Sequence, residues 1–413
     1  MPPKGSKAAT TTARTVVVRP SVKAEAPTRV AVPATATATL SPFDRATRVL
    51  AVAHVLTALI KANATAGCHT AQRKVLLGQY QLMPAVVADG VARAVLKACT
   101  SEIGESLKRL ASFLAELCKT MRSTHDDDVL AETVIKALLP LHNAADKTVR
   151  TAVISLVEQL LRTLKADDAA NAKPQRAALF DTLVGALCER IHDKHAAVRE
   201  KAVAAVGLFQ LARKDDDLTQ CLLFAMCEDF NAAVRRQAVC SVTAQKEIYF
   251  GSVVRLTGDV VSSVRMAAWD MLGQYKFSRL VAFARVQSID VVSLITTGLH
   301  DASQLVRVAA ASALTRGWLH RDCQGNCMAL ISGIEFGTQA GSALALEIAS
   351  VVYRSARKSA ANRDVEAKLL SEAALDLKSL TTANALCWKA ACLDALEGSA
   401  HVGDRTLMGG RSQ

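Results

Sequence analysis

A motif of the form D-x4-V-R-x2-A occurs four times in this sequence and restricts the fold more than any other feature. The acid and arginine of the four copies are Asp193 and Arg199, Asp229 and Arg235, Asp259 and Arg265, and Asp301 and Arg307. A degenerate fifth copy has Val149 and Arg150 but no acid six residues before the arginine. Successive arginines lie 49, 36, 30 and 42 residues apart, a period typical of two-helix solenoid repeats.

The chemistry of these residues explains their spacing. An aspartate at the turn before a helix can accept hydrogen bonds from free N–H groups and lies near the positive end of the helix dipole. The valine and alanine then face the core. The arginine, one turn into the helix, can reach an aspartate of its own or of the next unit. We therefore predict that the four aspartates and four arginines form a structural ladder, and the pattern is that of HEAT repeats.

The rest of the chain indicates one helix after another. Six of the nine prolines lie in the first 42 residues, and aromatic residues make up only 4% of the chain. We predict an all-α fold, a HEAT-repeat α-solenoid in which antiparallel helix pairs stack into a curved superhelix. It is expected at 44–397, with roughly nine repeats, clearest at 188–319. Residues 1–43 are predicted to be a disordered basic tail, with an organellar transit peptide as the alternative, and 398–413 a flexible glycine-rich tail.

The charge of the chain favours an acidic partner. The formal net charge is +12, and the basic excess extends beyond the N-terminal tail into the helical part. Nucleic acid is the first such partner to consider, and ordinary solubility charge is the alternative. The candidate DNA-binding residues are basic side chains outside the ladder, on three successive predicted helices: Arg73, Lys74, Arg93, Lys97, Lys108 and Arg109. Such residues could track phosphates without reading bases, or they could form solvated helix faces.

Other side chains do not combine into a reactive site. His320, Cys323 and Cys327 have a loose zinc-like spacing but lack a second ligand pair. The eleven cysteines include no C-x-x-C pair, and no phosphate-binding loop is present. No apolar run reaches the roughly 18 residues of a membrane span. The sequence therefore predicts no catalytic residues, no metal site, no cofactor and no membrane association.

Several segments resemble the condensin subunit 3 family, the HEAT-repeat subunits of condensin. The resemblance is carried by EDFNAAVRRQAVCSV at 228–242, by ITTGLHDASQLVRVAAASALTRGWL at 295–319 and by LTTANALCWKAACLDAL at 380–396. SLKRLASFLAEL at 106–117 is similar to an early repeat of the family. The resemblance covers about 45–396 and concerns the N-terminal part of the family's longer chains.

The resemblance implies a non-catalytic regulatory subunit. Such a subunit binds the kleisin subunit of condensin, which connects it to the paired SMC ATPases. Together with the kleisin it holds double-stranded DNA without sequence specificity during mitotic chromosome condensation. It would lie in the nucleus and on chromosomes, and in the cytoplasm during part of the cell cycle. The alternative is a HEAT-repeat protein scaffold or transport adaptor, similar to phosphatase scaffolds or karyopherins, which would not bind DNA.

Overall fold

The computed structural model describes residues 42–101, 105–125, 128–163, 174–209, 216–244, 246–334, 336, 343–356 and 381–393. By contacts the chain divides into two units, Met1–Thr47 and Arg48–Gln413; the first helix begins in the first unit, and all later helices lie in the second. The predicted tail at 398–413 lies outside the described residues. So does the predicted tail at 1–43, except for Pro42 and Phe43, which begin the first helix.

The described residues are helical and contain no strand, so the predicted all-α class is confirmed. The first helices are α1 (Pro42–Ala64), α2 (His69–Leu82), α3 (Pro84–Ser101), α4 (Glu105–His125), α5 (Val129–Leu138), α6 (Lys147–Leu161), α7 (Pro174–Ile191), α8 (Ala196–Val206) and α9 (Asp217–Cys227). They continue with α10 (Ala232–Ser241), α11 (Phe250–Leu256), α12 (Ser262–Leu272), α13 (Phe277–Gln287), α14 (Val291–Leu299), α15 (Gln304–Ser312), α16 (Cys327–Gly333) and α17 (Ala343–Ala356). Short helical turns lie at Ala66–Cys68, Leu139–Asn143 and Glu247–Tyr249, a π-helix η5 covers Ala313–Asp322, and residues 382–393 are also helical.

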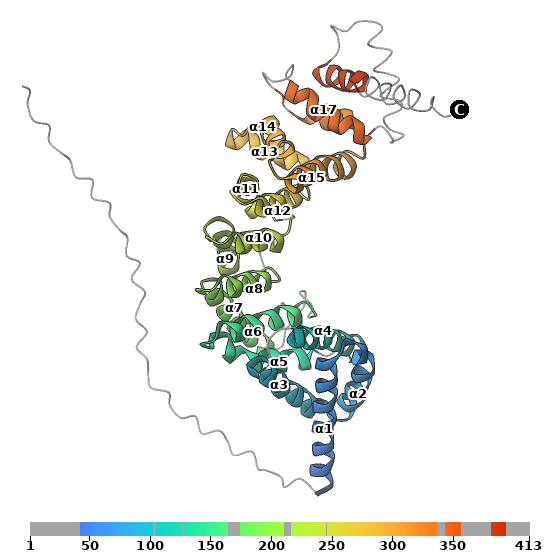
Figure 1. Ribbon diagram of the computed structural model, residues 1–413, viewed down its shortest axis with the longest axis vertical. Coiled ribbons are helices and arrows are strands. Elements are labelled where there is room, and N and C mark those ends of the chain that lie inside the picture. Colours follow the sequence, from blue (N-terminus) through green and yellow to red (C-terminus); the bar gives the residue numbers. More distant parts are fainter. Residues whose placement is uncertain are drawn as a thin grey trace, which may run out of the picture. The chain divides into compact units, whose positions relative to one another are not determined.

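The helices form two layers that can be followed in Figure 1. In one layer α4, α6, α8, α10, α12 and α15 each pack against the next, and we call it the ladder layer because five of these helices carry a motif arginine. In the other layer α3, α5, α7, α9 and α11 pack in the same order. Each motif helix also packs against the helix that precedes it, as α7 does against α8 and α14 against α15. This is the two-helix repeat that the motif period predicted.

The motif residues pack as their pattern predicts. In each of the four complete copies the valine five residues after the acid, such as Val198 or Val306, is buried. The alanine three residues after the arginine, such as Ala202, is buried as well. These small side chains let neighbouring helices approach closely. One such close approach is at Gly298 of α14, where a Cβ atom would collide with the indole ring of Trp269.

The segment that ends the α15 helix has a defined structural role. Its π-helix η5 contains Trp318, whose Nε1 donates to the carbonyl of Tyr275 at 3.3 Å. Arg321 donates to the carbonyls of Gly273 and Tyr275 at 2.8 and 2.9 Å. Because these carbonyls follow the end of α12, Trp318 and Arg321 attach η5 to the preceding repeat and satisfy backbone groups just beyond that helix.

Candidate nucleic-acid interface

Four motif arginines each hold the aspartate of the following copy. Arg199 donates from Nε and Nη2 to the two carboxylate oxygens of Asp229, at 2.7 and 2.9 Å. Its remaining nitrogen, Nη1, donates to the backbone carbonyl of Asp193 in its own copy at 2.9 Å. The sequence left open whether the arginine reaches its own or the next acid. It contacts both, the next through the carboxylate and its own through the backbone.

The same geometry recurs along the layer. Arg235 holds Asp259 at 2.8 and 2.9 Å, and Arg265 holds Asp301 at 2.6 and 2.7 Å. Arg150, from the degenerate copy, holds Asp193 at 2.8 and 3.0 Å. The ladder therefore begins one repeat before the first complete motif, because an arginine needs only the acid of the copy that follows it.

Each ladder aspartate also closes its own turn. One carboxylate oxygen of Asp193 accepts from the N–H of His195 at 2.9 Å, and that of Asp229 accepts from Asn231 at 2.8 Å. Asp259 and Asp301 accept from Val261 and Ser303 in the same way. These hydrogen bonds differ from the predicted ones, in which the aspartate would accept from a free N–H group of the helix. The donor is instead the N–H of the N-cap residue, two positions after the acid. The aspartate thus fixes the turn before the helix instead of capping the helix.

The ladder charges stabilise one another. Burial alone would raise the pKa of Asp193, but hydrogen bonds from Arg150 and His195 and the nearby guanidinium charges lower it. The hydrogen bonds from Arg265 lower the pKa of Asp301 against the opposing effect of desolvation. A guanidinium that is paired in this way is a poor candidate for contacting a ligand. Basic side chains outside the ladder are therefore the candidates for a binding surface.

The structure places four of the six predicted DNA-binding residues in two different layers. Arg93 and Lys97 are exposed on α3, which packs against α5 in the second layer. Lys108 is exposed on α4, in the ladder layer, with the half-buried Arg109 beside it. Because α3 and α4 belong to different layers, these four residues do not lie on one layer of the solenoid.

Arg73 and Arg93 are engaged in ion pairs. On α2, Arg73 contacts Glu116 of α4 at 3.3 Å, while its neighbour Lys74 is exposed. Arg93 contacts Asp89 one helical turn earlier at 2.6 Å. Both pairs are at least partly exposed, so each contributes little to stability and leaves the cation accessible to a competing phosphate.

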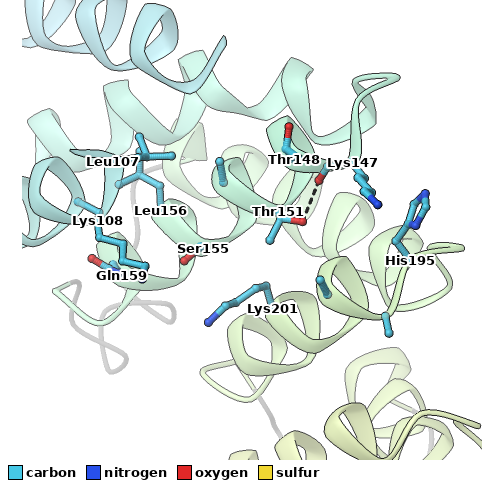
Figure 2. A pocket seen from close by; sticks show the side chains of 14 residues that line it. Leu107, Lys108, Lys147, Thr148, Thr151, Ser155, Leu156, Gln159, His195 and Lys201 are labelled. Carbon is cyan, nitrogen blue, oxygen red and sulfur yellow. Dashed lines mark hydrogen bonds between the residues drawn. The ribbon is translucent and has the colours of Figure 1, made fainter. Parts of the chain in front are cut away.

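A groove of about 610 Å³ crosses the ladder layer between α4, α6 and α8, and Figure 2 shows it from close by. Lys108 comes from α4, Lys147 from the first turn of α6, and Lys201 from α8, with His195 at the turn before α8. No aspartate or glutamate is among the described residues that line it. Three ammonium groups around a groove without lining carboxylates create a surface of positive potential.

The floor of the groove is polar along one stripe of α6. Thr148, Thr151, Ser155 and Gln159 line it at spacings of three or four residues, which places them on one face of the helix. Thr151 donates its hydroxyl to the carbonyl of Lys147 at 2.8 Å. Hydroxyl and amide groups beside lysines are typical of surfaces that contact the phosphates and sugars of DNA rather than its bases.

Of the groove residues, only Lys108 was predicted from the sequence. Lys147 lies three residues before the ladder arginine of its helix, and Lys201 lies two residues after the next ladder arginine. The signal that could have found them is their position relative to the motif arginines. An alignment of the motif copies places both lysines in one layer, whereas clusters within single helices do not. Their distance along the chain hides the relationship.

The part of the chain that the structure describes offers no site for metal chemistry. Its His, Cys, Asp and Glu side chains include no group of three that could hold a metal ion. No single described helix is long and apolar enough to cross a membrane. One strongly bent pair, α13 with α14, passes that test by length and composition.

The fold and the arginine–aspartate ladder define a HEAT-repeat solenoid, and comparisons with known proteins agree. No protein-family model matches the chain. The chain is similar to condensin complex subunit 3 of Homo sapiens, with 30% identity over 216 residues that cover 51% of this chain and 20% of the human protein. It is 21% identical over 233 residues to condensin complex subunit 3 of Schizosaccharomyces pombe, covering 55% of this chain and 25% of that protein.

A solved structure has the same fold. The crystal structure of the S. pombe condensin Cnd3–Cnd2 subcomplex superposes with a TM-score of 0.64 and 19% identity, and covers 84% of this chain and 42% of the solved chain. The matched segments span a fifth to a quarter of the curated relatives' length. The predicted resemblance is thus confirmed, and the chain is condensin subunit 3-like.

Proposed function

We propose that this chain is a non-catalytic, condensin-type regulatory subunit that holds double-stranded DNA without sequence specificity in the groove between α4, α6 and α8. The observation that carries the DNA-binding role is the groove lining, in which three lysines occur with no aspartate or glutamate among the described residues. A cationic surface neutralises phosphates and releases counterions whatever the base sequence. The similarity to condensin complex subunit 3 supports a role in mitotic chromosome condensation.

The proposal includes a protein partner. The solved relative Cnd3 is part of a subcomplex with Cnd2, which supports a second condensin subunit, the kleisin, as the direct partner of this chain. Through the kleisin the chain would connect to the SMC ATPase pair. The same similarity supports a location on chromosomes in the nucleus, with a cytoplasmic pool in part of the cell cycle.

The test is a salt titration of duplex DNA binding by the full chain, with and without kleisin. The groove variant changes Lys108, Lys147 and Lys201 to glutamate, and the matched control changes Lys74, Arg93 and Lys97, which lie outside the groove. We expect binding that falls steeply with salt, that is insensitive to sequence, and that is lost in the groove variant.

The control separates the possible outcomes. If only the control variant loses binding, DNA lies on the surface formed by the basic residues of α2 and α3, and the groove assignment is wrong. If neither the chain nor its kleisin complex binds DNA, the scaffold or adaptor alternative is favoured. A thermal melt of each variant shows whether a loss of binding reflects a loss of folding.

A further inference from the structure

Arg307, the last arginine of the ladder, has two parallel N–H donors, at Nε and Nη2, that hold no carboxylate of the described part of the chain. We call this pair of donors its fork. Arg307 donates from Nη1 to the carbonyls of Asp301 and Ala302, at 2.7 and 3.1 Å, as the earlier arginines do within their own copies. In each of the four earlier rungs Nε and Nη2 hold a carboxylate. For Arg307 neither atom has an acceptor among the described residues, and the side chain is exposed.

Arg307 makes no hydrogen bond to the carboxylate of the acid in its own copy, although its positive charge helps to lower the pKa of Asp301. The Asp301 carboxylate already accepts hydrogen bonds from Nε and Nη2 of Arg265, at 2.6 and 2.7 Å. Arg307 therefore contacts Asp301 only through the backbone carbonyl. A planar guanidinium with two parallel N–H groups free is matched in geometry by a carboxylate that binds both.

The surface beside this fork is apolar. Leu305 and Val308 of α15 are 65% and 60% exposed. At 100° per residue Val308 lies between the other two around the helix, about 60° from Leu305 and about 100° from Arg307, so Val308 is the exposed apolar side chain nearer to the fork. Underneath, Val306 and Ala310 anchor α15 in the core.

The other motif helices differ at the two positions that Leu305 and Val308 occupy. The equivalent pairs are Thr148 and Thr151 on α6, Ala197 and Glu200 on α8, Ala233 and Arg236 on α10, and Ser263 and Met266 on α12. Only α15 among these helices has large apolar side chains at both positions. The apolar surface and the open fork therefore coincide on one helix.

We propose that Arg307, Leu305 and Val308 form a docking site for an extended peptide segment of a partner chain, one that presents an aspartate or glutamate next to a large apolar side chain. The carboxylate completes the fork as a ladder aspartate does in the earlier rungs. The neighbouring apolar side chain covers Leu305 and Val308, which excludes water from the ion pair and strengthens it. The site is separate from the lysine groove, so it does not depend on the proposed DNA binding.

The probe is a random peptide library displayed on phage and selected on the immobilised full chain. We expect the enriched peptides to carry an acid beside leucine or phenylalanine. A fluorescent synthetic copy should bind the chain and lose at least about tenfold in affinity with Arg307→Ala. Arg307→Lys, which keeps the charge but not the fork, should give an intermediate loss.

Two controls make the result specific. Arg236→Ala removes an exposed arginine from α10 in the same layer and should leave the affinity unchanged. The peptide with its acid changed to the amide should bind the native chain as weakly as the acid peptide binds Arg307→Ala, and should be insensitive to that substitution.

Three results would overturn the proposal. The first is a selection that yields no acidic–apolar peptides. The second is a peptide whose binding survives Arg307→Ala but is lost when the groove lysines are reversed. The third is displacement of the peptide by inorganic phosphate, which would mean that the fork recognises phosphate. Thermal melts that coincide with the native chain show that the exposed Arg307 substitutions leave the fold intact.

Discussion

The two ends of the ladder layer carry the same motif and present different surfaces. Around α6 and α8 the arginine–aspartate pairs are buried, and the groove above them carries lysines and hydroxyl groups. On α15 the arginine is exposed, and the adjacent positions carry Leu305 and Val308. The motif fixes the residues that face the core and the neighbouring turn. The positions that face away from the core are free to vary, so one scaffold can present an electrostatic surface and an apolar one.

The ladder itself changes along the layer. The exposed fraction of the arginine side chain is 5% for Arg150 and Arg199, 12% for Arg235 and 17% for Arg265. Arg307 completes the series as an exposed residue. A buried charge depends on its partner far more than an exposed one does, so the rungs nearest the groove should be the most sensitive to mutation.

The largest expected effect comes from breaking a buried rung. Arg199→Ala leaves the Asp229 carboxylate buried without its bidentate partner and should destabilise the fold by about 3–5 kcal/mol. Arg307→Ala, where no carboxylate loses a partner, should change stability by about 0.5 kcal/mol or less. Urea unfolding followed by circular dichroism measures both. Equal losses for the two variants would contradict the difference between the two ends of the ladder.

A second comparison concerns how closely α14 and α7 pack against their neighbours. Gly298→Ala places a methyl group against the indole of Trp269 and should destabilise the fold by about 1–3 kcal/mol. Gly185→Ala in α7 meets open space and should stabilise the helix by about 0.5–1 kcal/mol. Thermal melts that shift in the same direction for both variants would show that the close packing around Trp269 relaxes without cost.

The third prediction sharpens the difference in surface chemistry. Lys201→Ala removes one cation from the groove and should lower the slope of log affinity for DNA against log salt by about 1. Arg307→Ala should leave that slope unchanged, because the α15 surface lies outside the groove. The slopes follow from fluorescence anisotropy at several salt concentrations. A similar decrease in both variants would mean that DNA extends over the whole ladder layer.

The smallest effect concerns acid. Arg265 lowers the pKa of Asp301 in the folded chain, so the stabilisation it provides is present above the unfolded pKa of about 3.9. It is lost as the pH falls through the lower folded value. The urea concentration at the unfolding midpoint should therefore decrease as the pH is lowered below about 4. Arg265→Met should make this decrease smaller. Asp181→Asn, at an exposed carboxylate of α7, is the matched control and should not alter it.

The sequence by itself determined the class of fold. Apolar residues at helical spacing predict helices, and a recurring motif predicts stacked pairs, because both signals are local and each copy repeats them. The buried Val198 and Ala202 needed no tertiary information, since their spacing from Arg199 places them on the core side of one helix. The segments at 228–242 and 295–319 also sufficed to indicate the resemblance to condensin subunit 3.

Only the tertiary structure decided which side chains meet. Whether Arg199 binds Asp193 or Asp229 depends on the rotation between consecutive repeats, and helical periodicity does not contain that angle. Lys108, Lys147 and Lys201 converge because α4, α6 and α8 stack, although long stretches of chain separate them. Periodicity is a property of one helix, whereas a groove or an open ladder end is produced by packing between helices, and there the sequence alone gives no distances.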